Sequence, residues 1–153
     1  MSATPVTHLN FHGEARAALE FYATAFGGAA FIRTYGEFGM PAGLPDSDRV
    51  VFGQVASPIG FTIAAYDIPG TSDTPRVAGS ARRENGTTIT DQSFFLALNA
   101  DTLDEATRYW EALATDATIV EPLAASAWSA GFGMLTDRFG VTWVLNVTPD
   151  PQS

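Results

Sequence analysis

The sequence contains no cysteine and no lysine, and both absences narrow its chemistry. Without cysteine there can be no disulfide, no thiolate nucleophile and no thiolate zinc site. The eight cationic side chains are all arginine and face 17 acidic ones, which gives a formal net charge of −9. These few cations are scattered along the chain and form no basic surface for phosphates. We therefore expect no nucleic-acid partner.

Long apolar runs and targeting signals are also missing. The chain has no run of about 18 apolar residues, and the N-terminal MSATPVTHLN lacks a charged region followed by an apolar stretch. We therefore expect a cytoplasmic protein that does not bind membranes. Hydrophobic residues make up 46% of the 153 positions and charged residues only 16%, which indicates a folded globular chain.

The order strand, helix and then several strands occurs twice. In the first half, residues 5–11 alternate like a half-buried strand. Residues 14–26 follow with apolar side chains at helical spacing, and Gly27 and Gly28 end this helix. Its apolar stripe consists of Ala15, Ala18, Leu19, Tyr22 and Phe26. Strand-like runs follow at residues 29–35, 49–56 and 60–66, the last two joined by a tight turn at 57–59.

The second half repeats this order. Residues 92–99 are rich in Phe and Leu, and a capping box of Thr102 and Glu105 then opens a helix. The apolar stripe of that helix consists of Leu103, Ala106, Trp110 and Leu113. Strand-like runs follow at residues 117–121, 128–136 and 141–147, with a break at Pro122 after the first and a turn at 137–140 before the last.

These patterns predict one α+β domain, residues 1–153, built from two modules. The modules are predicted at residues 5–66 and 92–148, each β-α-β-β-β, with a connecting loop at 67–91. The loop is dense in Pro, Gly, Ser and Thr, so a lid, a partner contact and a plain or disordered surface excursion are all open, and the last is simplest. Arg82 and Arg83 in this loop are most simply a solvated pair, although they would meet an anionic ligand if the loop folded over a cavity.

Two such modules can cover the open faces of their sheets by curving round a common cavity. If Leu9 and Phe11 pack on the first helix, alternation places six side chains of the first module inward: His8, Asn10, Phe52, Gln54, Thr62 and Tyr66. A shift of register by one residue would exchange each of them for its neighbour. The aromatic candidates of the second module are Phe94, Trp128, Phe132 and Trp143. This ligand-binding set would suit a flat or apolar small molecule.

Two motifs carry a family resemblance. EARAALEFYATAFGG and WSAGFGMLTDRFGVTW, at their separation in the chain, resemble the vicinal oxygen chelate superfamily of glyoxalases, bleomycin-resistance proteins and dioxygenases, and within it the PhnB-like branch. The resemblance implies paired β-α-β-β-β modules that form a cupped mixed sheet around a central cavity, commonly in a homodimer. In the enzymes it also implies a divalent metal held by His, Glu or Gln from four inward strand positions.

The metal positions do not hold the residues that the enzymes use. The resemblance implies a glutamate after the turn glycine, and with Gly140 as that glycine the position falls on Val144, while Phe52 stands where PhnB-like relatives can carry His. His8 is a weak metal candidate and is more simply a strand histidine hydrogen-bonded to a neighbour. His12, at the start of the helix, fits solvent or capping. We therefore expect no cofactor, and no catalytic residue can be named.

The leading hypothesis is a metal-free homodimer that binds or sequesters an apolar or aromatic small molecule. The alternative is a metal-dependent lyase, isomerase or dioxygenase whose ligands are displaced by one residue or are supplied by the partner subunit. A third possibility is a structural or protein-interaction role through a dimer face. A serine hydrolase is excluded because no G-x-S-x-G motif occurs.

Overall fold

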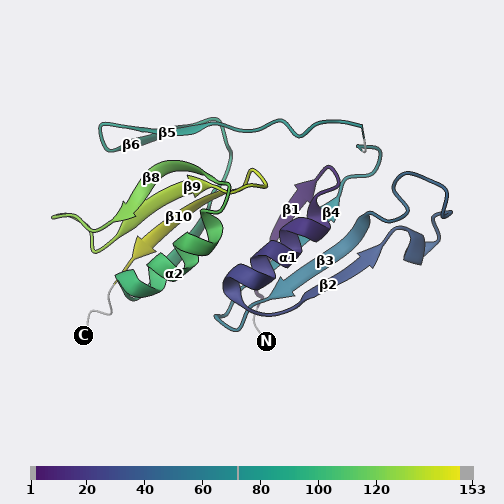
Figure 1. Cartoon of the computed structure of the whole chain (residues 1–153), viewed down its shortest axis with the longest axis horizontal. Helices are drawn as coiled ribbons and strands as arrows, with labels where there is room; N and C mark the ends of the chain where they lie inside the picture. The colour runs from purple at the N-terminus through teal and green to yellow at the C-terminus, as the bar shows by residue number, and fades with distance from the viewer. Residues whose placement is uncertain (1–2, 72, 149–153) are drawn as a thin grey trace. The chain divides into compact units, whose positions relative to one another are not determined.

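The computed structural model describes residues 3–71 and 73–148, and the chain divides into two compact units (Figure 1). Unit 1 is Met1–Val77 and unit 2 is Ala78–Ser153. Each contains a four-stranded mixed sheet with an α-helix packed on it, so the α+β class predicted from the sequence is confirmed. No helix among the described residues is long and apolar enough to cross a membrane.

Unit 1 follows the predicted strand-helix-strand order. Its elements are β1 (Thr7–Phe11), α1 (Ala15–Phe26), β2 (Ala30–Thr34), the 3-10 helix η1 (Gly36–Phe38), β3 (Val50–Ala56) and β4 (Thr62–Asp67). The strand order is β1-β4-β3-β2, and β1 runs parallel to β4 while the other pairs are antiparallel. All five residues of the predicted α1 stripe are buried, which confirms the helical face that the periodicity indicated.

Unit 2 repeats the same topology and adds a hairpin before it. Its elements are β5 (Ala81–Glu84), β6 (Thr87–Thr90), β7 (Leu96–Ala100), α2 (Leu103–Leu113), β8 (Thr118–Ala124), β9 (Phe132–Thr136) and β10 (Thr142–Val147). The main sheet has the order β7-β10-β9-β8, and β7 is parallel to β10. The predicted cap of α2 is confirmed, because the Glu105 N–H donates to Thr102 Oγ1 at 3.1 Å.

The turns between the last two strands of each unit share one geometry. In unit 1 the Ser57 N–H donates to the Phe61 carbonyl and the Gly60 N–H donates back to Ser57. Asp137, Gly140 and Val141 make the corresponding two bonds in unit 2. Both glycines have a positive φ, 105° at Gly60 and 85° at Gly140, a conformation that favours glycine. The two turns thus correspond hydrogen bond by hydrogen bond, as expected of an internal repeat.

The sequence predictions for the segment 67–91 and for the break at Pro122 were wrong. The segment 67–91 is not a plain loop, because it contains the β5–β6 hairpin, whose turn residues Asn85 and Gly86 both have positive φ. Pro122 does not break its strand, because β8 lies at the edge of its sheet and β9 is its one partner among the described strands. An edge position tolerates a residue without an N–H, and the register of β8 shifts on either side of Glu121.

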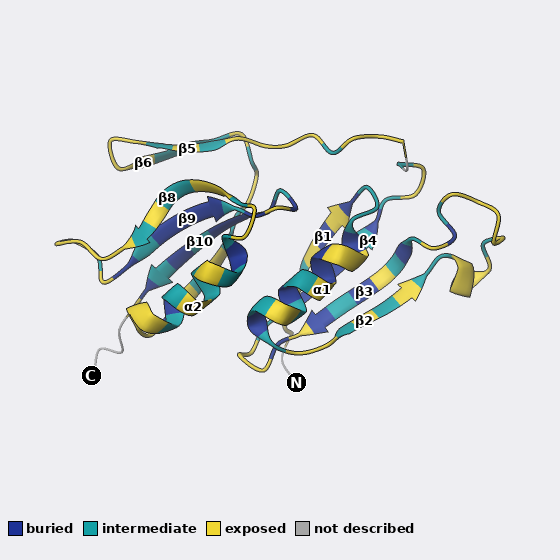
Figure 2. Ribbon diagram, viewed as in Figure 1, coloured by how far each residue is buried: buried dark blue, intermediate teal, exposed yellow. Residues whose placement is uncertain are grey.

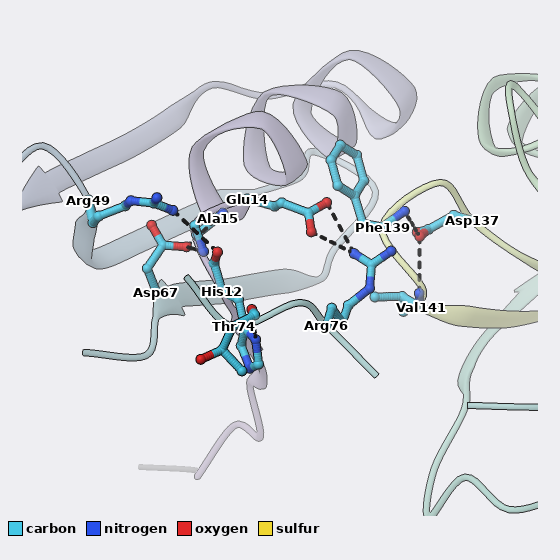
Figure 3. Close-up of polar contacts among 11 residues, drawn as sticks. His12, Glu14, Ala15, Arg49, Asp67, Thr74, Arg76, Asp137, Phe139 and Val141 are labelled. Carbon is cyan, nitrogen blue, oxygen red and sulfur yellow. Dashed lines mark hydrogen bonds and ion pairs between the residues drawn. The ribbon is translucent and has the colours of Figure 1, made fainter. Parts of the chain in front are cut away.

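Asp67, which the sequence placed in the connecting loop, is the buried last residue of β4. Its Oδ1 accepts the N–H groups of Gly13 at 2.8 Å and Ala15 at 3.0 Å, and its Oδ2 accepts that of Val50 at 2.9 Å. Figure 3 shows the carboxylate beside the start of α1. One side chain therefore holds the β1–α1 junction and the start of β3 to the end of β4.

The loops around this junction are also fixed by side chains of unit 1. Arg49 Nη1 donates to the His12 carbonyl at 3.3 Å and occupies the space where Gly13 has no Cβ. The His12 ring bonds through Nδ1 to the Thr74 carbonyl at 2.8 Å, so His12 is neither a cap nor a purely solvated group. Arg76 forms an ion pair with Glu14 at 3.0 Å (Figure 3). These contacts hold the segment after β4 against the start of α1.

A buried glycine of β9 provides a test of packing in unit 2. A Cβ at Gly133 would lie 2.8 Å from the Leu123 Cα and 2.8 Å from an atom of the Trp110 ring. We expect Gly133→Ala to lower the free energy of unfolding by about 1–3 kcal/mol, because the backbone of β8 cannot move aside freely. Urea denaturation measures this change. Gly43→Ala is the matched control, since no atom of the described residues lies within 4 Å of its added Cβ. Equal stability of the two variants would contradict the packing argument.

Tyr35 makes the stability of unit 1 depend on pH in the alkaline range. Its hydroxyl donates to the Asp67 carbonyl at 2.7 Å, and its pKa is raised from the ordinary value by burial, then by Tyr66, Asp67 and Asp46. Because the folded state holds this proton more tightly than the unfolded chain does, the stabilisation is complete below the ordinary pKa and is lost as the pH rises through the raised one.

We therefore expect the free energy of unfolding to fall above pH of about 10, and to fall less steeply in Tyr35→Phe. At neutral pH the loss of the hydrogen bond should cost this variant about 1 kcal/mol. Urea denaturation at a series of alkaline pH values measures both effects. Identical slopes for the two proteins would show that Tyr35 does not contribute.

Candidate functional site

The six residues predicted to face inward in the first module share one face of the unit 1 sheet. Leu9 and Phe11 are buried on the α1 side, so the intervening His8 and Asn10 lie on the other face. The strand register continues that face from His8 to Ala64 and Gln54, and from Asn10 to Tyr66. Phe52 and Thr62 have the same alternation in β3 and β4. We call this face the open face of unit 1.

Aromatic rings form two edge-to-face pairs on the open face of unit 1. The rings of Phe31 and Phe52 lie 6.2 Å apart, and those of His8 and Tyr66 lie 5.4 Å apart. Phe31 and Phe52 are 48% and 42% exposed, which is unusual for Phe side chains in a folded unit. The Arg33 guanidinium lies 4.5 Å from the centre of the Phe31 ring. An exposed patch of rings of this kind is a typical surface for binding another molecule.

Polar groups stand among these rings. His8 Nδ1 is 3.0 Å from Asn10 Oδ1, so the hydrogen bond to a neighbour expected for His8 is present, and Nε2 has no such bond among the described residues. Gln54 and Thr62 are half-buried on the same face. The exposed and half-buried strand positions can be followed in Figure 2. The face therefore combines flat apolar surface with hydrogen-bonding groups.

The corresponding face of unit 2 is more apolar. Phe132, Met134, Val144 and Asn146 occupy it, because the register pairs Val144 with Met134 and Asn146 with Phe132. Gly133, in contrast, lies toward Trp110 of α2. Val144 also pairs with Ala97 of β7. The position at which the resemblance implies a metal-binding glutamate thus lies on the face opposite α2, between two apolar residues. We call it the open face of unit 2.

The β5–β6 hairpin lies against this open face of unit 2. The Arg83 guanidinium is 4.7 Å from the centre of the Phe132 ring, and Thr88 Oγ1 contacts Met134 Sδ at 4.0 Å. Figure 1 shows the hairpin beside β8. Arg82 points away and pairs with Glu84 at 2.8 Å, with both side chains more than half exposed. The expected solvated interpretation therefore fits Arg82, whereas Arg83 packs on the sheet.

Three predicted ligand-binding aromatics of the second module lie elsewhere. Trp143 is buried on the α2 side of the sheet, and its Nε1–H donates to Asp137 Oδ2 at 2.9 Å. It is a core residue, because it alternates with Val144 in β10. Phe94 precedes β7 and is 55% exposed, and Trp128 precedes β9 and is 94% exposed. Of the second-module set, only Phe132 lies on a sheet face opposite the helix.

Acidic and histidine side chains do not converge in the described residues. No group of three or more His, Asp or Glu that could hold a metal ion occurs within residues 3–71 and 73–148. The two most buried carboxylates have structural partners instead: Asp67 binds the N–H groups named above. Asp137 accepts the N–H groups of Phe139 at 2.8 Å and Val141 at 3.1 Å (Figure 3).

Comparison with known structures supports the fold assignment. A protein from Pseudomonas aeruginosa, PA1353, is 29% identical and superposes with a TM-score of 0.75 over 97% of this chain and 100% of that one. A PhnB protein from Bacillus cereus, named for a 3-demethylubiquinone-9 3-methyltransferase activity, is 24% identical. Its TM-score is 0.67 over 95% of this chain and 100% of that one. At this identity the second likeness concerns the fold alone.

Sequence comparison identifies the family. Protein YjdN of Escherichia coli is 37% identical over 54 residues, a match that spans 35% of this chain and 37% of YjdN. The model of the Glyoxalase/Bleomycin resistance protein/Dioxygenase superfamily matches residues 7–145, which span both α-helices and both four-stranded sheets except the last two residues of β10. The chain therefore belongs to the Glyoxalase/Bleomycin resistance protein/Dioxygenase superfamily.

Proposed function

We propose that this protein binds a flat aromatic or apolar small molecule on the open face of unit 1, without a metal ion. The observation that carries the proposal is the pair of exposed rings, Phe31 and Phe52, beside the His8–Tyr66 pair on the same face. A protein of this size gains nothing in stability by exposing two Phe rings to water. A planar ligand that covers them removes that apolar surface from solvent and adds edge or face contacts between rings.

The polar residues of the face give such a ligand its orientation. Asn10, Gln54 and Thr62 offer amide and hydroxyl groups at the edges of the aromatic surface. Nε2 of His8 is a further donor or acceptor, depending on the tautomer. A ligand with one or two oxygen or nitrogen substituents would therefore be preferred over a pure hydrocarbon. Binding or sequestration requires only this recognition, and no reacting group has to be assigned.

A metal-dependent activity is the second candidate, and one observation favours it. His8 is exposed on the open face of unit 1 with Nε2 not engaged, which is the state of a histidine able to bind a metal. Against this candidate, the neighbouring positions of the face are Ala64 and Gln54 by register, and the last-strand position in unit 2 is Val144. A firmly held divalent ion needs three or four protein ligands.

The aromatic face gives the first test. We expect Phe52→Ala to weaken the binding of naphthalene-sized aromatic compounds about tenfold, because one ring contact and its buried area are worth roughly 1–2 kcal/mol. Amide chemical shifts in β1, β3 and β4 measure this affinity. Phe38→Ala is the matched control, since Phe38 is 70% exposed on η1 and off the sheet. Equal affinity of the two variants would remove Phe52 from the site.

Calorimetric titration with zinc, nickel, manganese and iron(II) salts tests the absence of a metal. We expect no stoichiometric binding at micromolar concentrations, because the open faces supply a single imidazole and no convergent carboxylates among the described residues. His8→Ala should leave any weak heat of binding unchanged. Micromolar or tighter uptake of one ion, abolished by His8→Ala, would overturn the metal-free proposal in favour of the second candidate.

A further inference from the structure

Arg83 is the feature of unit 2 that the proposed function leaves unused. Its guanidinium lies between the hairpin and the open face of unit 2, stacked over Phe132. Nη1 donates to Thr88 Oγ1 at 2.7 Å, across the hairpin from β5 to β6. The guanidinium plane is thus held by a ring on one side and by a hydroxyl at one nitrogen. An arginine fixed in this way has lost much of its rotamer freedom before any ligand arrives.

Arg83 also lacks an acidic partner among the described residues. Four other arginines form ion pairs with carboxylates: Arg33, Arg76, Arg82 and Arg138. Glu121 of β8, which lies opposite Met134, makes no ion pair with Arg83. The Nε of Arg83 is buried and donates to no acceptor in the part of the chain that the structure describes. Arg49 is also half-buried without an ion pair, but it donates to the His12 carbonyl, whereas Arg83 keeps a buried Nε without an acceptor among the described residues. Such a cation favours the binding of an anion.

We propose that Arg83 binds the carboxylate of an aromatic or apolar acid on the open face of unit 2. The edge of the guanidinium that carries Nε has two parallel N–H groups, the arrangement that matches the two oxygens of a carboxylate. Phe132 lies under the guanidinium, and Val144, which pairs with Met134, lies further along the same face, so both provide apolar surface for the rest of the ligand. A small organic acid is therefore the ligand class expected at this site, rather than a neutral aromatic compound.

The hairpin can make room for such a ligand at little cost. Among the described strands, β5 and β6 pair with each other and form no ladder with the four-stranded sheet of unit 2. The contacts described between the hairpin and the open face are side-chain contacts of Arg83 and Thr88. A two-stranded hairpin held by side chains moves without breaking main-chain hydrogen bonds of the sheet. The bond from Arg83 to Thr88 lies within the hairpin and is kept when the hairpin shifts, so the guanidinium stays oriented while its buried Nε becomes accessible.

This inference concerns a different face from that of the proposed function, and it rests on Phe132 for the aromatic part of the ligand and on Arg83 for its charge. The experiment separates these two parts. The full-length protein is titrated with 2-naphthoate and, separately, with the neutral 2-naphthamide, with amide and arginine Nε–H chemical shifts as the readout. The same titrations are repeated on Arg83→Gln and on Arg82→Gln. Arg82 is the matched control because it is the adjacent residue, exposed and already paired with Glu84.

We expect 2-naphthoate to bind about tenfold more tightly than 2-naphthamide, since a hydrogen-bonded charge pair is worth more than a neutral contact. The Arg83 Nε–H signal and the amides of Phe132 and Val144 should shift with it. Arg83→Gln should abolish the preference for the acid, whereas Arg82→Gln should keep it. Equal affinities of the acid and the amide for the wild-type protein, with no shift at Arg83, would overturn the inference and leave the open face of unit 1 as the aromatic site.

Arg83→Gln could disturb the hairpin itself, so the wild-type protein is also titrated with formate, which tests the anion site without any substitution. A saturable shift of the Arg83 Nε–H signal with formate supports the anion site without any aromatic group. If formate gives this shift and neither naphthalene compound binds, the proposed function fails and the anion site stands. If neither formate nor 2-naphthoate shifts the Arg83 signal, the anion site is overturned, whatever the open face of unit 1 binds.

Discussion

The buried carboxylate of Asp67 determines the geometry of unit 1. It ends β4 and accepts backbone N–H groups from the start of α1 and from the start of β3, while its own carbonyl accepts the Tyr35 hydroxyl. Charged acceptors bind N–H groups more strongly than neutral ones. The bonds fix how β1 turns into α1, and therefore which side of β1 lies against the helix. The orientation of His8 and Asn10 on the open face of unit 1 follows from that constraint.

Unit 2 reaches the same topology with a different polar anchor. Asp137 lies in the turn between β9 and β10, where it accepts two turn N–H groups and the Trp143 indole N–H. The end of β10, where unit 1 has Asp67 in β4, is the apolar Val147. Each unit thus keeps the strand pairing while a single carboxylate stabilises a different corner. Divergence of this kind leaves the two open faces free to differ, and they do: one is aromatic and polar, the other apolar and crossed by an arginine.

Local periodicity was sufficient to predict the helices and the facing of the first module. The stripe of α1 and the alternation in β1, β3 and β4 depend on neighbours a few residues apart, and the pattern records them directly. The same rule also assigns Trp143 to the core. Adjacent residues of a strand face opposite sides, so Trp143 cannot share the open face with Val144. The Asn85-Gly86 pair was likewise a readable hairpin signal inside the presumed loop.

Contacts between distant residues could not be predicted in this way. The packing of Arg83 on Phe132, the bonds from Asp67 to Gly13, and that from His12 to Thr74 join residues far apart in the chain. No periodicity encodes them, since they depend on how the elements fold back on each other. The role of Asp67 had only a weak sequence signal, an acid directly after an apolar strand. The members of the candidate site were therefore more predictable than the groups that hold them in place.

The irregular edge strands have a consequence for the behaviour of the chain at high concentration. β2 shifts register between Arg33 and Thr34, and β8 shifts twice and contains Pro122, which has no N–H to donate. A strand from another molecule could pair with either edge over a few residues at most, because beyond them the backbone N–H and C=O groups are no longer in register. These two edges are therefore poor templates for fibre growth, and the irregular pairing lies at the edge strands while the inner strand pairs of both sheets stay regular.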